Sequence, residues 1–292
     1  MEDPSFPSLE AEVGIYIMNI FSKAALAAAC LGAPLLVPAG SASAGVGDLL
    51  VAPTRLVLNG GRSAEVILNN IGDEPATYRI SAEFRRMTPE GMLEDVTQPT
   101  ELETIARDMI IFAPRRVTLA PHEPQSVRIA ARPPKGLPDG EYRIHLLFRA
   151  VPPAAPVATA SGAPAKGLSF KLTPVYGVTI PVIVRLGNLK VEAAISNVHV
   201  EQHEGRPAIA MDISRNGGRS TFGEVRVLKA GVKDPVALSR AVAVYTELNK
   251  REVVIPVDER FKGDLSGPVT VEYLETFDDG TKTIAETQAV LR

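Results

Sequence analysis

The segment from Leu168 to Val184 alternates apolar residues with polar or small ones over seventeen positions. A two-residue period predicts a β-strand with one apolar face, because successive side chains of a strand point to opposite sides. The even positions form this face: Leu168, Phe170, Leu172, Pro174, Tyr176, Val178, Ile180, Val182 and Val184. Strands of globular proteins usually have about 3 to 10 residues, so about half of this strand exceeds what its own domain needs. The surplus indicates a function outside that domain.

Shorter alternating segments bounded by turn residues recur along the rest of the chain. One of them places Tyr142, Ile144, Leu146 and Phe148 between Glu141, Arg143, His145 and Arg149, which predicts a strand with one buried and one solvated face. Long helical periodicity is absent. Patterns of this kind favour antiparallel β-sandwiches, and we expect an all-β fold in which helices are few and short.

The chain is expected to divide into two domains near residue 187. Val151 to Lys166 carries prolines among alanine, serine and threonine, a composition that cannot bury a core and that predicts a flexible loop. The long strand follows this loop, and Leu186-Gly187-Asn188 then predicts a hinge. We expect an N-terminal sandwich over residues 45–186, with the long strand at 168–184, and a C-terminal sandwich over residues 187–292.

The first 44 residues predict a segment that is removed. Residues 1–17 are acidic and are interpreted as a misassigned start, whereas a short basic stretch, an apolar run and Ala42-Ser43-Ala44 follow from Met18. We expect a secretory signal cleaved after Ala44. Its apolar run has about fourteen residues, against the roughly twenty that a spanning helix needs, so no membrane insertion is expected. The only cysteine, Cys30, lies inside this signal, which leaves no disulfide; a lipid anchor on Cys30 is the alternative.

Charge and motif content argue against several function classes. The formal net charge is −3 and basic residues are scattered, so nothing indicates a nucleic-acid surface. No nucleophile motif or phosphate-binding loop occurs, so we expect no enzyme and no cofactor. His199 and His203 have the spacing of helical zinc ligands, but their neighbours alternate as in a strand, where such positions lie about 13 Å apart. We expect no metal site.

Several short motifs resemble one known family in their order and spacing. They are Val51-Ala52-Pro53-Thr54-Arg55, Leu68-Asn69-Asn70, Phe112-Ala113-Pro114-Arg115-Arg116, Leu119-Ala120-Pro121, Gln125-Ser126-Val127-Arg128, Pro138-Asp139-Gly140-Glu141-Tyr142-Arg143, and Ile180 to Arg185. With the two sandwiches and the long strand, they resemble the periplasmic pilus-assembly chaperones of the PapD type, part of the chaperone–usher family. The resemblance covers essentially the whole mature chain and implies two immunoglobulin-like β-sandwich domains in tandem.

The resemblance also implies a function based on a missing strand. A pilin subunit is an immunoglobulin-like sandwich that lacks its last strand, and its open groove would aggregate. The chaperone lends its own strand to this groove by donor-strand complementation and delivers the subunit to an outer-membrane usher. For this chain the resemblance implies a periplasmic location and pilin-like subunits as partners. The candidate donors are Leu168, Phe170, Leu172, Tyr176, Val178 and Ile180, whereas Val182 and Val184 are expected in the core of the first domain.

Members of this family bind the C-terminal carboxylate of the subunit with a basic pair. Arg55 matches the first member, and a guanidinium can donate two charge-assisted hydrogen bonds to a carboxylate. The second member is a lysine four residues before the arginine that ends the long strand, but Pro181 occupies this position. Lys171 would lie about 46 Å from Arg185 along an extended strand, too far to replace it. Since Pro181 has no N–H, we expect it at a bulge or on an unpaired side of its strand.

Three charged residues match the family's contact between domains. By resemblance, Arg185 and Glu141 form an ion pair that fixes the angle between the two domains, and Asp264 is a candidate third member.

A structural subunit or adhesin of a surface fibre is the alternative function. Such a protein should carry a free donor segment at its mature N-terminus and lack a full second domain. Gly45 to Leu50 is too short for that segment, and the second half of the chain is long enough for a complete sandwich. The chaperone is therefore favoured.

Overall fold

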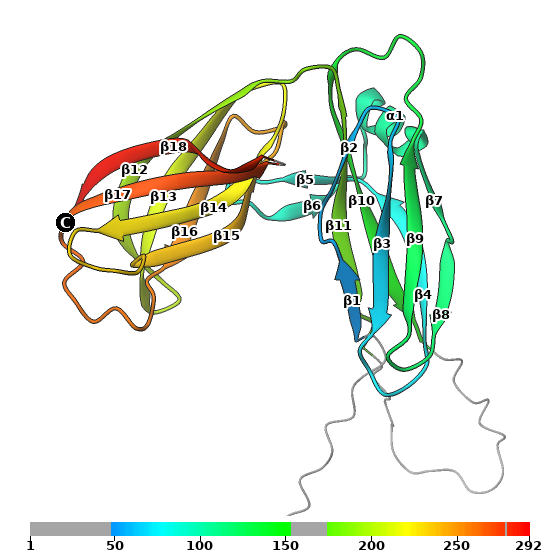
Figure 1. Ribbon diagram of the computed structural model, residues 1–292, viewed down its shortest axis with the longest axis horizontal. Helices are drawn as coiled ribbons and strands as arrows, with labels where there is room; N and C mark the ends of the chain where they lie inside the picture. Colours follow the sequence, from blue (N-terminus) through cyan, green and yellow to red (C-terminus); the bar gives the residue numbers. More distant parts are fainter. Residues whose placement is uncertain (1–47, 153–173, 278) are drawn as a thin grey trace, which may run out of the picture. The chain divides into compact units, whose positions relative to one another are not determined.

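The described chain is built almost entirely from β-strands (Figure 1). The structure is a computed structural model that describes residues 48–152, 174–277 and 279–292. Its strands form two sandwiches, one before and one after Gly187, so the predicted all-β fold with two sandwiches in tandem is confirmed. Residues 1–44, interpreted as a misassigned start followed by a signal, lie outside the described residues.

The first sandwich packs a four-stranded sheet against a five-stranded sheet. The first sheet contains, in spatial order, β1 (Leu49–Ala52), β3 (Ser63–Asn70), β9 (Pro124–Ala131) and β7 (Ile110–Ala113). The second contains β2 (Leu56–Asn59), β11 (Gly177–Leu186), β10 (Gly140–Val151), β4 (Ala76–Glu83) and β8 (Arg116–Leu119). Neighbouring strands are antiparallel except β2 and β11, which are parallel. A hairpin of β5 (Arg85–Met87) and β6 (Leu93–Asp95) stands apart from both sheets.

The core of the first sandwich follows the predicted alternation. Tyr142, Ile144, Leu146 and Phe148 of β10 are all buried, as expected. The prediction that the other face of β10 is solvated is wrong at His145, which is 0% exposed. The ring of Tyr245, from the second sandwich, lies edge-on to His145 with 6.3 Å between the ring centroids. The side chain of Tyr245, which comes from outside the sheet, therefore covers a face of β10 whose sequence pattern predicted exposure to solvent.

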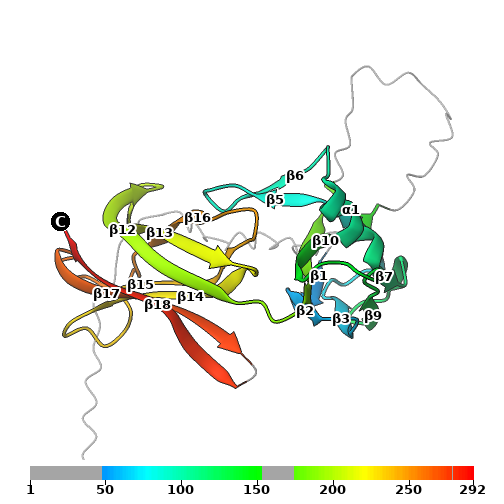
Figure 2. The same ribbon diagram turned by 90° about the horizontal axis from the view of Figure 1, so that it is seen from above.

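The second sandwich also packs two antiparallel sheets. One contains β12 (Val191–His203), β13 (Arg206–Gly217) and β16 (Lys250–Pro256); the other contains β15 (Ala237–Val244), β14 (Thr221–Lys229), β17 (Gly267–Phe277) and β18 (Gly280–Leu291). The curved sheets are visible in Figure 2. We did not predict β15, because its buried residues Val242, Ala243 and Val244 are consecutive rather than alternating.

His199 and His203 both lie on β12, so the prediction of a strand at this position is confirmed. The His199 ring Nδ1 lies 2.8 Å from the carbonyl of Asn197. Within residues 48–152, 174–277 and 279–292, no group of three or more histidine, cysteine, aspartate or glutamate side chains could hold a metal ion.

The single helix of the described chain, α1 (Glu101–Met109), was not predicted. Its N-terminus is a capping box: Thr100 Oγ1 accepts from the N–H of Glu103, and the Glu103 carboxylate accepts from the N–H of Thr100. The spacing Thr100-x-x-Glu103 is a sequence signal for a helix start that could have identified it. The helix is too short to cross a membrane, and no other helix occurs in the described part of the chain.

The predicted long strand is only partly present. Its first candidate donors, Leu168, Phe170 and Leu172, lie outside the described residues. Residues 174–176 are described but are not part of a strand, and β11 begins at Gly177. Strand β10 ends at Val151, just after the point where the N–H of Ala150 donates to the carbonyl of Tyr176. Because β10 extends only one residue past Ala150, its ladder with this segment ends there, which limits the length of the strand.

Candidate functional site

The two edges of β11 bond to different strands. The N–H of Ala150 donates to the carbonyl of Tyr176 over 2.9 Å, and in an antiparallel ladder this places the backbone groups of even-numbered residues on the β10 side. The N–H of Gly60 donates to the carbonyl of Arg185, also over 2.9 Å. The backbone groups of odd-numbered residues therefore face the opposite edge, toward β2.

The edge on the β2 side is covered along only half of β11. Strand β2 pairs with residues Val182 to Arg185 of β11 and with no earlier residue of β11. The preceding strand, β1, does not continue along β11 but pairs with β3 in the other sheet (Figure 1). From Gly177 to Pro181, no strand of the described chain pairs with this edge. We call this stretch, residues 177–181 on the β2 side, the open edge.

The predicted donor residues differ in how accessible they are. Tyr176 is 56% exposed, next to the exposed Val175, whereas Val178 is half-buried against the core of the first sandwich. Ile180 is 1% exposed and belongs to that core, so its prediction as a donor is corrected. The strand has entered its own sandwich by this position, and a buried side chain cannot fill a partner's groove. The core positions predicted for Val182 and Val184 are confirmed.

Pro181 lies at the end of the open edge. Its cross-strand partner on β10 is His145, and the ladder between β10 and β11 has no bulge. Because 181 is an odd position, the missing N–H falls on the β2 side, one residue before the β2 ladder begins at Val182. The prediction that Pro181 lies on an unpaired side of its strand is confirmed.

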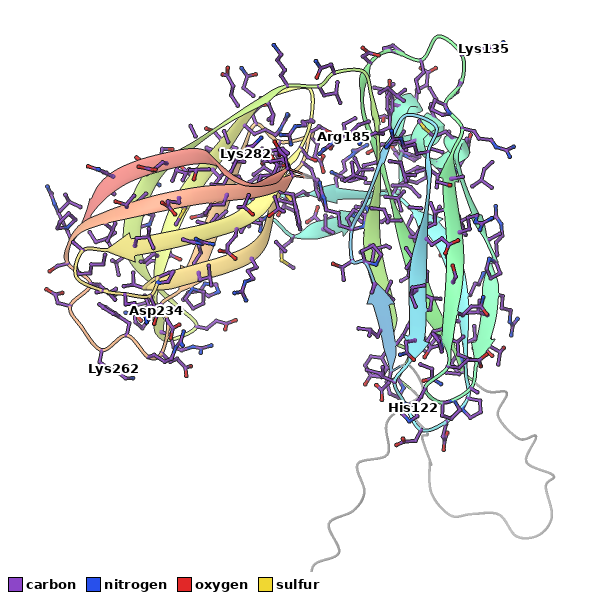
Figure 3. All side chains as sticks on the ribbon, in the orientation of Figure 1. His122, Lys135, Arg185, Asp234, Lys262 and Lys282 are labelled. Atoms are coloured by element: carbon purple, nitrogen blue, oxygen red, sulfur yellow. The ribbon has the colours of Figure 1, made fainter. Side chains whose placement is uncertain are left out.

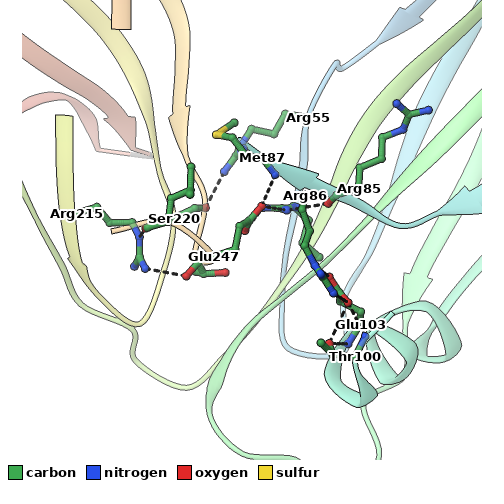
Figure 4. Close-up of polar contacts among 12 residues, drawn as sticks. Arg55, Arg85, Arg86, Met87, Thr100, Glu103, Arg215, Ser220 and Glu247 are labelled. Atoms are coloured by element: carbon green, nitrogen blue, oxygen red, sulfur yellow. Dashed lines mark hydrogen bonds and ion pairs between the residues drawn. The ribbon is translucent and has the colours of Figure 1, made fainter. Parts of the chain in front are cut away.

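Arg55 stands at the same end of the open edge. It precedes Leu56, the register partner of Val182, so it lies beside Pro181. Its Nη2 donates to Ser220 Oγ over 3.2 Å (Figure 4). Its guanidinium carbon lies 4.4 Å from the ring centroid of Phe222. Its Nη1 is buried and has no hydrogen-bond partner among the described residues. Burial lowers the pKa of Arg55, but an arginine remains protonated at neutral pH.

The predicted ion pair between Arg185 and Glu141 is present in the structure. Arg185 Nε donates to Glu141 Oε2 over 2.9 Å, and Arg185 is labelled in Figure 3. The N–H of Ser220 donates to the same carboxylate oxygen over 3.1 Å, and Ser220 accepts from Arg185 through its carbonyl. Ser220 is thus the third member of this cluster. Asp264 is not: its carboxylate accepts from the N–H of Ser266, in the loop before β17.

A pocket of about 640 Å³ adjoins Arg55. Its lining contains Arg55 and Arg185, together with residues of β2 and of the β17 end. The lining also contains two carboxylates, and both are already paired: Arg219 donates to both oxygens of Glu275 over 2.8 and 2.9 Å, and Lys282 donates to Asp279. The pocket is therefore suited to an anionic group that reaches Arg55.

The β5–β6 hairpin contributes contacts that the sequence did not indicate. The N–H of Met87 donates to Glu247 Oε1 over 2.9 Å (Figure 4). The N–H of Glu252 donates to the carbonyl of Pro89 over 2.8 Å. Glu247 also accepts from Arg143 of β10, whose guanidinium lies 3.6 Å from the ring centroid of Tyr245. These contacts join the two sandwiches and so help to hold Ser220 and Phe222 against Arg55. No spacing rule connects residues so far apart in the chain.

The chain is similar to pilus-assembly chaperones of solved structure. The YadV chaperone shares 14% identity and a TM-score of 0.44, over 84% of this chain and 100% of that chain. The CupB2 chaperone of Pseudomonas aeruginosa shares 15% identity and a TM-score of 0.43, over 83% and 100%. The CsuC–CsuE chaperone–tip subunit complex of archaic chaperone–usher Csu pili of Acinetobacter baumannii shares 14% identity and a TM-score of 0.43, over 84% and 99%. No family model and no curated protein matches the chain.

Proposed function

We propose that this protein is a periplasmic chaperone that binds pilin-like subunits by donor-strand complementation and delivers them to an outer-membrane usher. The observation that carries the proposal is the open edge of β11, which ends at the cationic side chain of Arg55. An unpaired edge is a template for another strand, and exposed apolar residues beside it would cover the partner's core. Such a function requires binding alone and no catalytic group.

The charge of Arg55 selects the direction of the docked strand. A strand on the open edge that runs parallel to β11 ends where β2 begins, and its terminal carboxylate then meets the guanidinium of Arg55 at the pocket that this residue lines. A strand in the opposite direction would bring an ammonium group or a neutral chain to this guanidinium. The parallel arrangement is therefore favoured, with Arg55 as the anchor for the carboxylate.

The apolar residues before the open edge supply the donor side chains. Leu168, Phe170, Leu172 and Tyr176 occupy even positions of the alternating sequence, and the half-buried Val178 marks the transition to the first sandwich. Each fully buried side chain of this size contributes about 1.5 to 3 kcal/mol, so four of them contribute about 6 to 12 kcal/mol before the entropic cost of association. This is enough for a stable complex without nucleotide hydrolysis.

Co-purification from periplasm with a pilin-like subunit encoded nearby tests the proposal. We expect Phe170→Glu and Tyr176→Glu to reduce subunit recovery at least about tenfold, because a buried unpaired carboxylate opposes docking. Val290→Glu is the matched control, since Val290 is an exposed apolar residue of β18 in the second sandwich. Undiminished recovery with both donor variants would contradict the proposal, as would an equal loss with Val290→Glu.

A structural subunit of a fibre is less well supported. Such a subunit would present a sandwich that needs a strand from another copy, whereas the second half of this chain forms two paired sheets of three and four strands. The first sandwich offers the backbone groups of its open edge to a partner, and its own core lacks no strand among the described residues.

A further inference from the structure

Three arginines lie side by side on neighbouring strands of the first sandwich. Arg116 of β8 pairs with Arg79 of β4, and Arg79 in turn pairs with Arg149 of β10. Paired residues project from the same face of a sheet, and the next residues along two of these strands, Tyr78 and Phe148, are buried. The three arginines therefore lie on the outer face of the sheet, where all of them are exposed. We call them the arginine row.

The positions on either side of the arginine row carry no charge. They are Thr118, Thr77 and Val151 on one side, and Ser81, Leu147 and Thr179 on the other. Glu83, the only carboxylate of β4, accepts from Arg85 Nη2 over 3.2 Å. Because like charges at paired positions of a sheet repel one another, a carboxylate that joins the arginine row relieves this repulsion.

The arginine row leads to the first residue of the open edge. This residue, Gly177 of β11, pairs with Arg149 and has no side chain. A Cβ added to Gly177 would lie 2.9 Å from Leu147 Cδ1, so an apolar methyl group lies between Arg149 and the open edge. The stem of an arginine can pack on such a group while its charged end stays in solvent. A strand docked on the open edge then takes the next position of the row, beside Gly177.

Arg149 is the member of the row that can reach a docked strand. Neighbouring strands lie about 4.8 Å apart, so a strand on the open edge lies about 10 Å from β10, with β11 between them. The extended side chains of an arginine and a glutamate together span this distance. Arg79 and Arg116 lie one and two strands farther away, so they add positive potential without direct contact.

We infer that the open edge selects a partner strand with an acidic side chain beside Gly177, where this side chain forms an ion pair with Arg149. The inference rests on the proposed function and assigns Arg149 as a specificity-determining residue of its site. An acidic residue at this position offsets the repulsion within the arginine row, a neutral residue leaves it unchanged, and a basic residue adds to it. The protein thus distinguishes pilin-like subunits by one side chain of the docked strand.

Two forms of one subunit test this role of Arg149. Gly177 and Pro181 are four positions apart, so a parallel strand that ends beside Pro181 places the residue four positions before its last one beside Gly177. The probe is the pilin-like subunit that co-purifies with the protein, prepared with glutamate and with glutamine at this position. We expect wild-type protein to bind the glutamate form about two- to fivefold more tightly, the range of an exposed ion pair. Arg149→Gln should bind both forms equally. At about 1 M salt the wild-type preference should disappear, because the Debye length is then about 3 Å.

Arg116→Gln is the matched control, because it removes the same charge from the same row two strands farther from the open edge. Both arginines are exposed, so both variants should unfold in urea as wild type does, and Arg116→Gln should retain most of the preference for the glutamate form. Equal affinity of wild-type protein for the two forms would overturn the inference. An equal loss of preference in Arg149→Gln and Arg116→Gln would also overturn it, since a general effect of surface charge does not distinguish the two arginines. Failure of wild-type protein to bind either form would instead overturn the proposed function.

Discussion

The guanidinium of Arg55 lies 4.4 Å from the ring centroid of Phe222, and the two residues come from different sandwiches. This contact helps to fix the orientation of the cationic side chain at the end of the open edge of β11. The Nη2 of the same guanidinium donates to Ser220 Oγ, whereas Nη1 is buried and has no hydrogen-bond partner among the described residues. A side chain of the second sandwich, Phe222, is thereby part of the proposed binding site on the first sandwich.

Removing the aromatic ring should weaken the anchor without unfolding the protein. We expect Phe222→Leu to reduce affinity for a subunit with a free carboxylate roughly 2- to 30-fold, the equivalent of a cation–π contact worth about 0.5 to 2 kcal/mol. The same substitution at Phe261, a partly buried residue of the second sandwich that does not line the pocket next to Arg55, should leave the affinity unchanged. Titration of immobilised chaperone with subunit gives both values. Equal affinities of Phe222→Leu and wild type for the subunit would show that Phe222 does not contribute to the binding site.

Burial of His145 should make stability depend on pH. Burial, with the nearby charges of Arg143, Arg85 and Arg55, lowers the pKa of His145 to about 3. Between pH 6.5 and 3 the unfolded chain binds a proton here and the folded chain does not, so acid favours unfolding. The contribution of neutral His145 to the free energy of unfolding is fully present above pH 6.5. It decreases as pH falls, by up to about 1.4 kcal/mol per pH unit.

Urea unfolding of wild type and His145→Leu at pH 7.5 and pH 5 measures this contribution. Leucine cannot titrate, and neither ring nitrogen of His145 has a hydrogen-bond partner to lose among the described residues. Between the two pH values wild type should lose about 2 kcal/mol more than the variant. Identical losses would show that His145 is protonated in the folded protein or exposed to solvent.

The contact between Arg143 and Glu247 should couple energetically. The Arg143 side chain is 8% exposed, and Glu247 accepts from it and from the N–H of Met87. We expect a double-mutant cycle with Arg143→Gln and Glu247→Gln to give a coupling free energy of about 1 to 3 kcal/mol. The cycle uses free energies of unfolding from urea titrations. A coupling near zero would mean that the two side chains do not interact in solution.

A side chain at Gly91, in the turn of the β5–β6 hairpin, should lower the free energy of unfolding. This residue has φ +89°, and a Cβ added there would overlap the guanidinium of Arg251 in the second sandwich. Gly136 has φ +79° but open space around it, so Gly136→Ala reports the backbone strain alone, about 1 kcal/mol. Gly91→Ala should cost about 1 kcal/mol more than this control in thermal or urea unfolding, because Arg251 must move and lose its hydrogen bond to the carbonyl of Ala243. Equal costs would show that the hairpin does not pack against Arg251.

The sequence predicted those parts of the fold that depend on local alternation. The buried residues Tyr142, Ile144, Leu146 and Phe148 of β10, and Val182 and Val184 of β11, follow a two-residue period and were identified correctly. Ile183 of β11 is buried as well, because residues of the second sandwich pack against it. The strand β15 was missed because its three consecutive buried residues break this period, and α1 because its capping box was overlooked.

Sequence periodicity could not predict the contacts between the two sandwiches. His145, Glu141 and Arg143 occupy positions that alternate as a solvated face, and they are buried because Tyr245, Ser220 and Glu247 approach from the other sandwich. Arg55 and Arg185 were found only through the family resemblance, and Ser220 and Phe222 carry no motif at all. The position of Ile180 could not be settled from alternation, because core and donor residues share one face of the strand.

Amide hydrogen exchange at the open edge tests the central claim most directly. In free protein no strand of residues 48–152, 174–277 or 279–292 pairs with the N–H groups of Gly177 and Thr179 on this edge, whereas the N–H of Ile183 lies within the β2 ladder. When a pilin-like subunit is bound, the exchange of Gly177 and Thr179 should slow at least about tenfold, and that of Ile183 should not change. Unchanged exchange at Gly177 and Thr179 in a complex that demonstrably contains the subunit would contradict the account, because the subunit would then be bound elsewhere.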